Sequence, residues 1–254
     1  MIERMYFSMK RLLALVLAGL MVFSLAACTS TPDTDYIIYS DNAFAPFEFM
    51  KDGAYTGVDM DLMAAIAEDQ GFTYEMKNEG FDAAMGAVQA GQADGMIAGM
   101  TINEKRKETY DFSEGYFEDG QIMVVAANST IAAEADLAGK KVAAKKGTES
   151  TKYAESLKET YGFEIIYYDD SPAMYQAVIT GAADACFEDF SVIGWAIKND
   201  GIALKSVGEV VNKAYYGFAV KKGTNPELIE KFNAGLKNIK ANGKYEEILA
   251  KYGY

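Results

Sequence analysis

Residues 87–94 read AVQAGQAD and residues 177–184 read AVITGAAD, so one eight-residue pattern recurs ninety positions further along the chain. In both copies a helical stretch ends at a glycine, Ala-Asp turns the chain, and a short apolar strand follows. These strands run out at Gly99 and Asp189, which are equivalent positions. Because the carboxyl ends of strands face the ligand crevice in open α/β sheets, the repeat predicts two similar lobes around a shared cleft.

Apolar, β-rich runs alternate with helical periodicity over the rest of the chain. This alternation predicts an α/β fold with mainly parallel sheets. The predicted strands cover 36–40, 73–76, 95–99, 122–126, 141–144, 165–168, 185–188 and 216–220, and the predicted helices cover 59–68, 81–90, 150–161, 172–180, 189–199, 226–241 and 244–251.

The N-terminal residues have the features of a secretory signal. Basic residues precede an apolar run over 12–25, which is shorter than the roughly 20 residues that a membrane-spanning helix needs. Small residues then lead to Cys28, a pattern that resembles bacterial lipoprotein precursors, whose cysteine thiol receives a diacylglycerol. We expect a signal peptide over 1–27, a lipid attachment at Cys28 and a flexible tether over 28–35, hence an extracytoplasmic protein anchored to the cell membrane. The alternative is a buried cysteine beside an ordinary cleavage site.

Composition excludes several functions. Without residues 1–27 the chain loses three basic residues and one acidic residue, so its formal net charge changes from −13 to −15, and nucleic acid is a poor partner. The absence of histidine excludes Ser-His-Asp and Cys-His catalysis and histidine-ligated metals. Cys186 is the one cysteine besides Cys28, so we expect no intramolecular disulfide and a small buried residue at 186. We expect neither a metal nor a cofactor.

A first candidate cluster is 41–49, DNAFAPFEF. Asp41 and Phe44 follow a predicted strand, so a carboxylate and an aromatic wall would face the crevice. We assign Phe47 and Phe49 to the core, which is the more frequent place for phenylalanine.

A second candidate cluster is 98–106, AGMTINEKR, where a strand end leads into a charged helical turn. The planar guanidinium of Arg106 suits a carboxylate. The alternative is that residues 105–107 form a single solvated basic run.

These clusters, together with 57–62 (GVDMDL) and 111–117 (DFSEGYF), resemble bacterial extracellular solute-binding proteins for amino acids, of the family 3 type, and in particular glutamine-binding proteins of ABC importers. The resemblance covers essentially the whole of 36–252. It implies a two-lobed periplasmic-binding-protein-like fold (type II) with a hinge between the lobes, a free amino acid as ligand, an ABC transporter permease as partner, a monomeric state and no catalysis.

The resemblance also implies roles for individual residues. Arg106 would hold the ligand α-carboxylate, with further backbone and hydroxyl contacts from Gly99 and Thr101. The second lobe would add the N-terminus of a helix, whose N–H groups face the carboxylate, and the matching positions there are Lys145 and Thr148.

Phe44 and Phe81 resemble the aromatic pair that sandwiches the ligand, and Asp189 matches the acidic residue that receives the α-ammonium. The chain departs from the family pattern at two positions. Glu149 stands where many relatives have glycine, so its carboxylate is expected to point away from the ligand. Glu188 stands where glutamine binders have histidine.

Burying a free amino acid brings two charges into the cleft, and each costs several kcal/mol if it is left unpaired. Arg106 and Asp189 would meet these charges from opposite walls, so closure of the lobes and binding are one event. We expect the chain to cross between lobes near 115–120 and 212–217, with a first lobe of 36–119 and 213–254 and a second lobe of 120–212.

Selectivity for the ligand side chain should come from Asp41, Lys145 and Glu188. Asp41 with Lys145 suits a neutral amide, which favours glutamine, because a carboxylate and an ammonium satisfy its donor and its acceptor together. If Lys145 pairs with Glu188 instead, Asp41 can attract a cationic side chain, and arginine, lysine or histidine becomes the ligand. A third hypothesis is a dehydratase-like enzyme on the same fold, with Glu188 as its acid or base.

Overall fold

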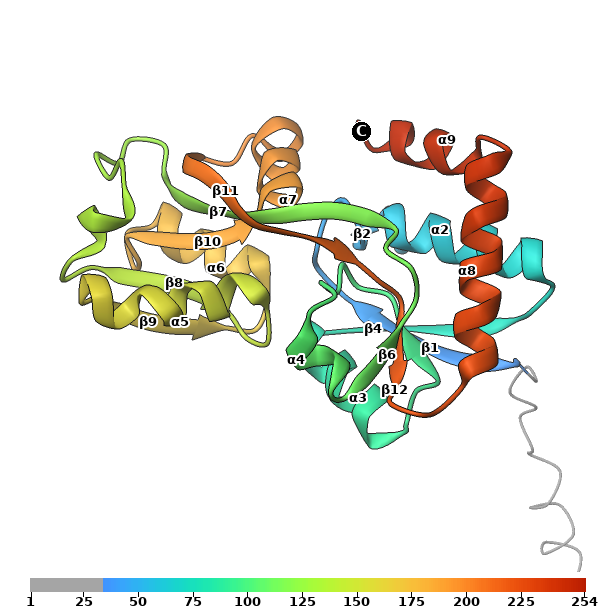
Figure 1. The fold of residues 1–254 in the computed structure, drawn as a ribbon. Coiled ribbons are helices and arrows are strands. Elements are labelled where there is room, and N and C mark those ends of the chain that lie inside the picture. Colours follow the sequence, from blue (N-terminus) through green and yellow to red (C-terminus); the bar gives the residue numbers. More distant parts are fainter. Residues whose placement is uncertain (1–33) are drawn as a thin grey trace, which may run out of the picture. The chain divides into compact units, whose positions relative to one another are not determined.

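A computed structural model describes residues 34–254. Cys28, the predicted signal segment and most of the predicted tether lie outside the described residues. Within residues 34–254 no helix is long and apolar enough to cross a membrane. Two five-stranded sheets with helices packed around them organise this part of the chain (Figure 1).

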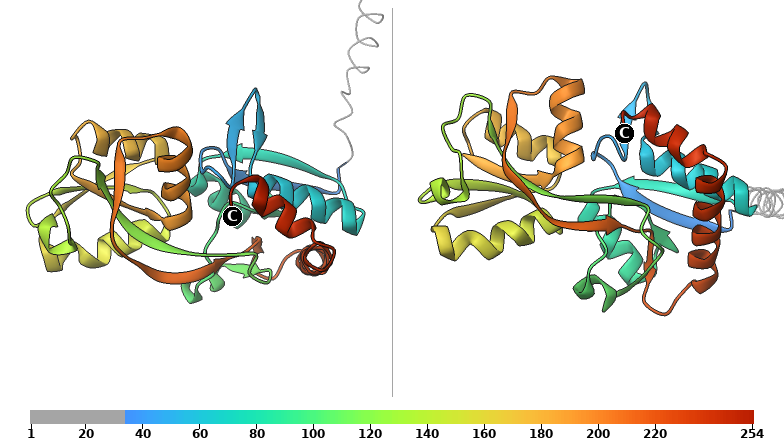
Figure 2. Two further views of the ribbon diagram at one scale, coloured as in Figure 1. Left: turned by 90° about the horizontal axis from the view of Figure 1, so that it is seen from above. Right: turned by 45° about the horizontal axis from the view of Figure 1, so that its top comes forward.

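The first sheet consists, in spatial order, of β4 (Tyr74–Glu79), β1 (Tyr36–Asp41), β5 (Gly95–Met96), β12 (Ala219–Lys221) and β6 (Tyr110–Phe112). β1 is parallel to β4 and β5, and β12 is antiparallel to β5 and β6. The helices of this part are α2 (Val58–Gln70), α3 (Phe81–Ala90), α4 (Glu104–Lys107), α8 (Pro226–Ala241) and α9 (Lys244–Lys251). A separate hairpin of β2 (Phe49–Lys51) and β3 (Ala54–Thr56) projects from it, as Figure 2 shows.

The second sheet consists of β11 (Leu204–Tyr216), β7 (Phe117–Ala126), β10 (Ala185–Asp189), β8 (Lys141–Lys145) and β9 (Glu164–Tyr168). β8 is parallel to β10 and β9, whereas β7 is antiparallel to β10 and β11. Around it lie α5 (Glu149–Tyr161), α6 (Ser171–Ile179), α7 (Phe190–Trp195) and the short turns η1 (Glu134–Leu137) and η2 (Ala196–Asp200). We call the part built on the first sheet the first lobe and the part built on the second sheet the second lobe.

The sequence repeat corresponds to a repeated structure. Gly91 after α3 and Gly181 after α6 both have left-handed backbone, with φ of 75° and 78°, a conformation that glycine adopts at low cost. The aspartate that ends each copy accepts a hydrogen bond from a strand N–H: Ile37 donates to Asp94 at 2.8 Å and Lys141 donates to Asp184 at 2.9 Å. The predicted two-lobed α/β fold with parallel strands is thereby confirmed.

The chain passes between the lobes along β7 and β11, which pair from Phe117 opposite Tyr216 to Ala126 opposite Leu204. Glycines occur at these passages as expected, and close packing also requires glycine at 115. A Cβ on Gly115 would lie 2.5 Å from the Cβ of Tyr215, well inside van der Waals contact. The lobe boundaries at 119/120 and 212/213 stay a prediction.

Several strands differ from the sequence prediction. Strand β11 was not predicted, because it is a twisted strand with many partly exposed residues, whose partner β7 lies nearly ninety residues earlier. The predicted strand 95–99 ends at Met96, and the predicted helix 189–199 divides into α7 and the π-helical turn η2.

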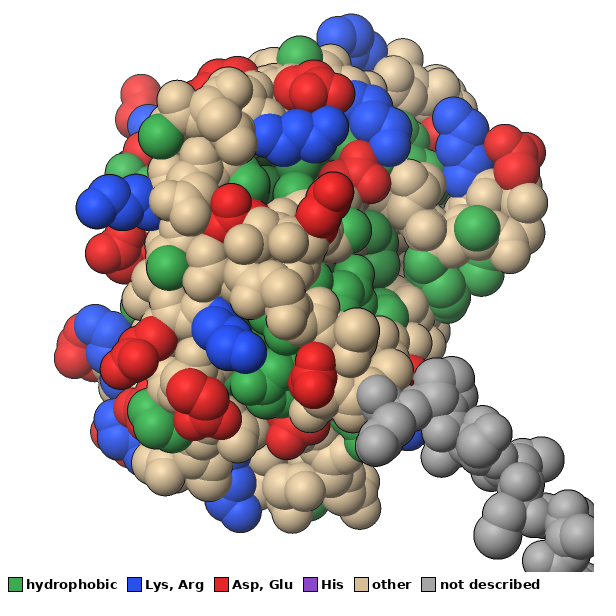
Figure 3. Space-filling model, turned by 90° about the vertical axis from the view of Figure 1, so that its right-hand side faces the viewer, with side chains coloured by type: hydrophobic (Ala, Val, Ile, Leu, Met, Phe, Trp, Pro, Cys, Tyr) green, Lys and Arg blue, Asp and Glu red, His purple; other side chains and the backbone are tan. Residues whose placement is uncertain are grey.

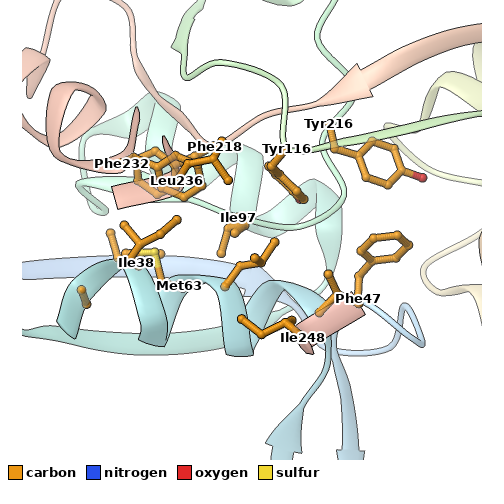
Figure 4. Close-up of a cluster of buried hydrophobic side chains, with 14 of the residues drawn as sticks. Ile38, Phe47, Met63, Ile97, Tyr116, Tyr216, Phe218, Phe232, Leu236 and Ile248 are labelled. Carbon is orange, nitrogen blue, oxygen red and sulfur yellow. The ribbon is translucent and has the colours of Figure 1, made fainter. Parts of the chain in front are cut away.

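Each lobe has its own apolar core. In the first lobe, α2 and α8 pack Met63, Phe232 and Leu236 against Ile38 of β1 (Figure 4). Cys186 lies in the core of the second lobe and is fully buried, as predicted. On the face drawn in Figure 3, acidic and basic side chains are interspersed, so the negative balance is not gathered into one patch there.

The two phenylalanines assigned to the core have different surroundings. Phe47 is fully buried and packs edge to face against Tyr216, which confirms its assignment. Phe49 is only half-buried, and its ring lies 5.3 Å from that of Trp195 in the second lobe. Phe49 therefore packs at the edge of the first-lobe core, as assigned, and also contacts the second lobe.

Candidate functional site

One pocket between the lobes collects all ten predicted ligand-binding residues. Strand ends and helix starts supply most of the lining, because the carboxyl ends of β1, β8 and β10 meet there. The lining residues are Asp41, Phe44, Phe81, Ala98, Gly99, Thr101, Arg106, Lys145, Thr148, Glu149, Glu188 and Asp189. The cavity is small, about 10 Å³, and holds roughly one water molecule. A larger ligand therefore requires the walls to separate or side chains to turn.

Arg106 is the cation that the first lobe contributes. Asn103 caps α4 by accepting a hydrogen bond from the Arg106 N–H, and the guanidinium turns inward and is 5% exposed. Nη1 donates to the carbonyl of Thr101 at 2.8 Å, and Nη2 donates to the carbonyl of Gly147 in the second lobe at 3.1 Å. Burial lowers the pKa of Arg106, opposed chiefly by the negative charge of Glu149.

Lys105 and Lys107, the neighbours of Arg106, are solvated, as the alternative interpretation of residues 105–107 predicted. Lys105 pairs with Glu108 and Lys107 pairs with Glu104, both at 2.7 Å and both on the exposed side of α4. Only the middle residue of the three reaches the pocket, because a helical turn sends adjacent side chains in different directions.

Asp189 is the acidic group at the end of β10. It is 7% exposed, and its carboxylate accepts hydrogen bonds from Tyr216 Oη at 2.5 Å, Ser150 Oγ at 3.1 Å and Gln121 Nε2 at 3.4 Å. Burial raises the pKa of Asp189, and these hydrogen bonds oppose the rise. Tyr216, at the passage between the lobes, was not predicted and connects the hinge to the site.

Lys145 and Asp41 form an ion pair across the lobes, and both side chains are buried. The ammonium lies 4.6 Å from the centre of the Phe44 ring and 5.9 Å from that of Phe81, which are distances of cation–π contact. Burial lowers the pKa of Lys145, but Asp41 and Glu188 outweigh it, and the net shift is upward.

Residues of its own lobe hydrogen-bond the carboxylate of Glu188. Its carboxylate accepts hydrogen bonds from Ser171 Oγ at 2.8 Å and Tyr175 Oη at 2.9 Å. Burial and the neighbouring Asp189 raise the pKa of Glu188 to about 7. The ion pair of Lys145 is formed with Asp41 and not with Glu188.

The expectation that the Glu149 carboxylate points away from the pocket is wrong. Glu149 lines the pocket, and its Oε1 lies 3.6 Å from Nε of Arg106 in the other lobe. The reason is electrostatic, because the buried guanidinium attracts the nearest carboxylate across the narrow gap. Thr148 also lines the pocket, but its hydroxyl caps α5 and accepts from the Thr151 N–H at 3.1 Å, so its backbone is the part that can face a ligand.

A pair of buried carboxyl groups behind the pocket was missed in the sequence. Glu48 and Asp59 are fully buried and contact each other, and both oxygens of Glu48 and Oδ1 of Asp59 have no other hydrogen-bond partner. Asp59 Oδ2 accepts from the N–H of Gly99 and from Tyr116 Oη, both at 2.8 Å. A shared proton between the two carboxyl groups satisfies this arrangement. The only sequence signal was two acidic residues within otherwise apolar stretches.

This pair predicts that stability falls as pH rises. Burial, then Asp59 and Asp41, raise the pKa of Glu48 well above its usual value, and burial raises that of Asp59 to about 6. A carboxyl with a raised folded-state pKa stabilises fully below its unfolded pKa, and this stabilisation is lost as pH rises through the folded pKa. We expect a loss on the order of 1–3 kcal/mol between pH 4 and pH 8, measured by urea unfolding. Glu48→Gln should make this decrease smaller, with Glu188 still contributing to it, while Glu68→Gln, on the exposed side of α2, should leave it unchanged.

A two-lobed α/β fold with opposite charges on facing walls defines a class of proteins that bind a small solute between closing lobes. The chain belongs to the bacterial extracellular solute-binding proteins, family 3, whose model matches residues 36–254.

Individual relatives agree in fold and differ in ligand. The chain is 30% identical over 272 residues to the ABC transporter glutamine-binding protein GlnH of Bacillus subtilis (strain 168), covering 96% of this chain and 97% of that protein. It is 49% identical to the second substrate-binding domain of a putative amino acid ABC transporter from Streptococcus pneumoniae Canada MDR_19A, with a TM-score of 0.59 and coverage of 85% and 99%. It is 36% identical to an ancestral arginine-binding protein bound to arginine, with a TM-score of 0.80 and coverage of 86% and 98%.

Proposed function

We propose that this protein captures a free amino acid between its two lobes and delivers it to an ABC importer. The observation that carries the proposal is that Arg106 from the first lobe and Asp189 from the second, both buried, line the same pocket. Arg106 would bind the α-carboxylate and Asp189 the α-ammonium, so each ligand charge meets its opposite. The aromatic rings of Phe44 and Phe81 would enclose the ligand carbon atoms.

We propose glutamine as the ligand. The ion pair of Lys145 with Asp41 supports this choice, because an inserted amide can accept from the ammonium and donate to the carboxylate. Basic amino acids are the second candidate, since the ancestral relative was solved with arginine bound and Asp41 can face a cationic side chain. Glu188 lies near enough to add negative charge in either case.

Replacement of Lys145 separates the two candidates. If glutamine is the ligand, Lys145→Met removes the donor to its amide oxygen and leaves Asp41 buried without its partner, so affinity should fall about a hundredfold. If arginine is the ligand, the same change frees Asp41, and arginine affinity should rise or hold. Titration calorimetry with L-glutamine and L-arginine measures both. Lys146→Met is the matched control, because Lys146 is exposed and pairs with Asp169.

A broader screen uses thermal unfolding of residues 29–254 with each of the twenty amino acids. A ligand present at 100 times its Kd adds about 2.7 kcal/mol of stability. A shift with glutamine, or with arginine, lysine or histidine, identifies the ligand class, and no shift with any amino acid contradicts the proposal.

We propose that the protein has no catalytic role. Glu188, the carboxylate that a dehydratase-like enzyme would use, is already hydrogen-bonded to Ser171, Tyr175 and the N–H of Asp189. These three hydrogen bonds hold the Glu188 carboxylate in place as an acceptor, while its pKa of about 7 makes turnover the deciding measurement. Turnover of prephenate or arogenate by the purified protein would overturn this part of the proposal.

We also propose that the protein is a monomer held on the cell membrane by a lipid on Cys28. Cys28→Ser should move nearly all of the protein from the membrane fraction to the soluble envelope fraction or the medium, because no helix within residues 34–254 is long and apolar enough to cross a membrane. Immunoblotting of the fractions measures the change, with Ser30→Ala as the control. Retention of the Cys28→Ser protein in the membrane would contradict the anchor.

A further inference from the structure

Glu149 begins α5 in the second lobe and places a carboxylate beside the guanidinium of Arg106 in the first. The two side chains are 20% and 5% exposed, so their ion pair is largely shielded from water. The pair lies in the wall of the candidate ligand pocket, among the residues that would contact an amino acid. Glu149 is therefore more than a surface residue at a helix start.

The two terminal nitrogen atoms of the Arg106 guanidinium already donate hydrogen bonds. Nη1 donates to the carbonyl of Thr101 and Nη2 donates to the carbonyl of Gly147, two residues before Glu149. Glu149 faces Nε at 3.6 Å, an ion-pair distance that is longer than a hydrogen bond. An incoming carboxylate would have to take the place of this looser partner.

Glu149 also has a second partner on the outside of the cleft. Its Oε1 accepts from the ammonium of Lys152, one helical turn further along α5, at 2.6 Å. Lys152 is 46% exposed, so it stabilises Glu149 at the rim of the pocket. The Glu149 carboxylate can thus leave Arg106 without losing all its positive neighbours.

We propose that Glu149 is an internal competitor that occupies Arg106 until the α-carboxylate of the ligand displaces it toward Lys152. This inference rests on the proposed function, in which Arg106 receives the ligand carboxylate. Two carboxylates at one buried guanidinium repel each other, so part of the ligand's binding free energy is spent in moving Glu149. Glu149 thereby lowers the affinity for the amino acid and holds the lobes together before the ligand arrives.

The test compares Glu149→Gln with Glu159→Gln, an equal charge change on the exposed side of α5. Titration calorimetry with L-glutamine and L-arginine should show that Glu149→Gln tightens the Kd of the bound amino acid about tenfold, whereas Glu159→Gln changes it less than twofold. Small-angle X-ray scattering without ligand should show a larger radius of gyration for Glu149→Gln than for the unsubstituted protein. Circular dichroism checks that each variant is folded.

The α-amide of the bound amino acid provides the decisive comparison, because it has no carboxylate to compete with Glu149. Its Kd, measured by competition against the acid at high concentration because the α-amide lacks the charged contact to Arg106, should change less than twofold in Glu149→Gln. An equal gain for the acid and its α-amide, or no gain for the acid in a folded variant that still binds it, overturns the inference and leaves the proposed function intact. Failure of the unsubstituted protein and both variants to bind any of the twenty amino acids overturns the proposed function and the inference with it.

Discussion

Arg106→Ala is expected to weaken amino-acid binding by about a hundredfold to a few thousandfold. Within residues 34–254, Arg106 and Lys145 are the buried cations, and Lys145 is paired with Asp41. The ligand carboxylate would therefore enter the closed pocket without a free positive partner. Leaving one member of a buried charge pair alone costs about 3–5 kcal/mol, and each 1.4 kcal/mol is about tenfold in affinity.

The measurement is titration calorimetry with the amino acid that stabilises the unsubstituted protein. Lys105→Ala is the matched control, since it removes the neighbouring charge from the same helix turn but pairs on the surface with Glu108. It should bind within twofold of the unsubstituted protein. Arg106→Lys should recover only part of the affinity, because an ammonium cannot reproduce the planar guanidinium contacts. Binding retained by Arg106→Ala would assign the carboxylate to another group.

Asp189→Asn is expected to weaken binding by about tenfold to a hundredfold while leaving the protein equally or more stable. The amide keeps the shape of the carboxylate but removes the charge that would meet the α-ammonium, and charge-assisted hydrogen bonds contribute about 1.5–3 kcal/mol each. Burial raises the pKa of Asp189, so the fold disfavours its charged form at pH 7 and a neutral amide removes that cost.

Weaker binding without a loss of stability would show that Asp189 contacts the ligand, whereas a structural role would lower the stability instead. Calorimetric binding and urea unfolding on the same samples measure both quantities. Asp169→Asn in the second lobe is the control, because that carboxylate is 83% exposed and its partner is the surface residue Lys146. If Asp189→Asn unfolds more easily and binds normally, Asp189 serves the hinge through Tyr216 and not the ligand.

The sequence predicted the lobes and the site residues because both depend on local patterns. Strand and helix periodicity locate most elements, and parallel strands present their carboxyl ends on one side, so the repeat alone assigns Gly99 and Asp189 to a cleft. The sequence also predicted that helices end at Gly91 and Gly181, and both glycines have the left-handed backbone expected there. Resemblance to a known family then supplied the individual roles.

The sequence by itself determined ten of the twelve residues that line the pocket, and the tertiary structure decided that Glu149 joins them and which of them pair there. Asp41 and Lys145 are separated by 104 positions, and nothing local chooses between Asp41 and Glu188 as the partner of Lys145. Glu149 was expected to turn outward, yet the buried guanidinium of Arg106 attracts it across the lobes. Propensity and periodicity act over a few residues, whereas charge pairing in a desolvated gap depends on how two separately folded lobes come together.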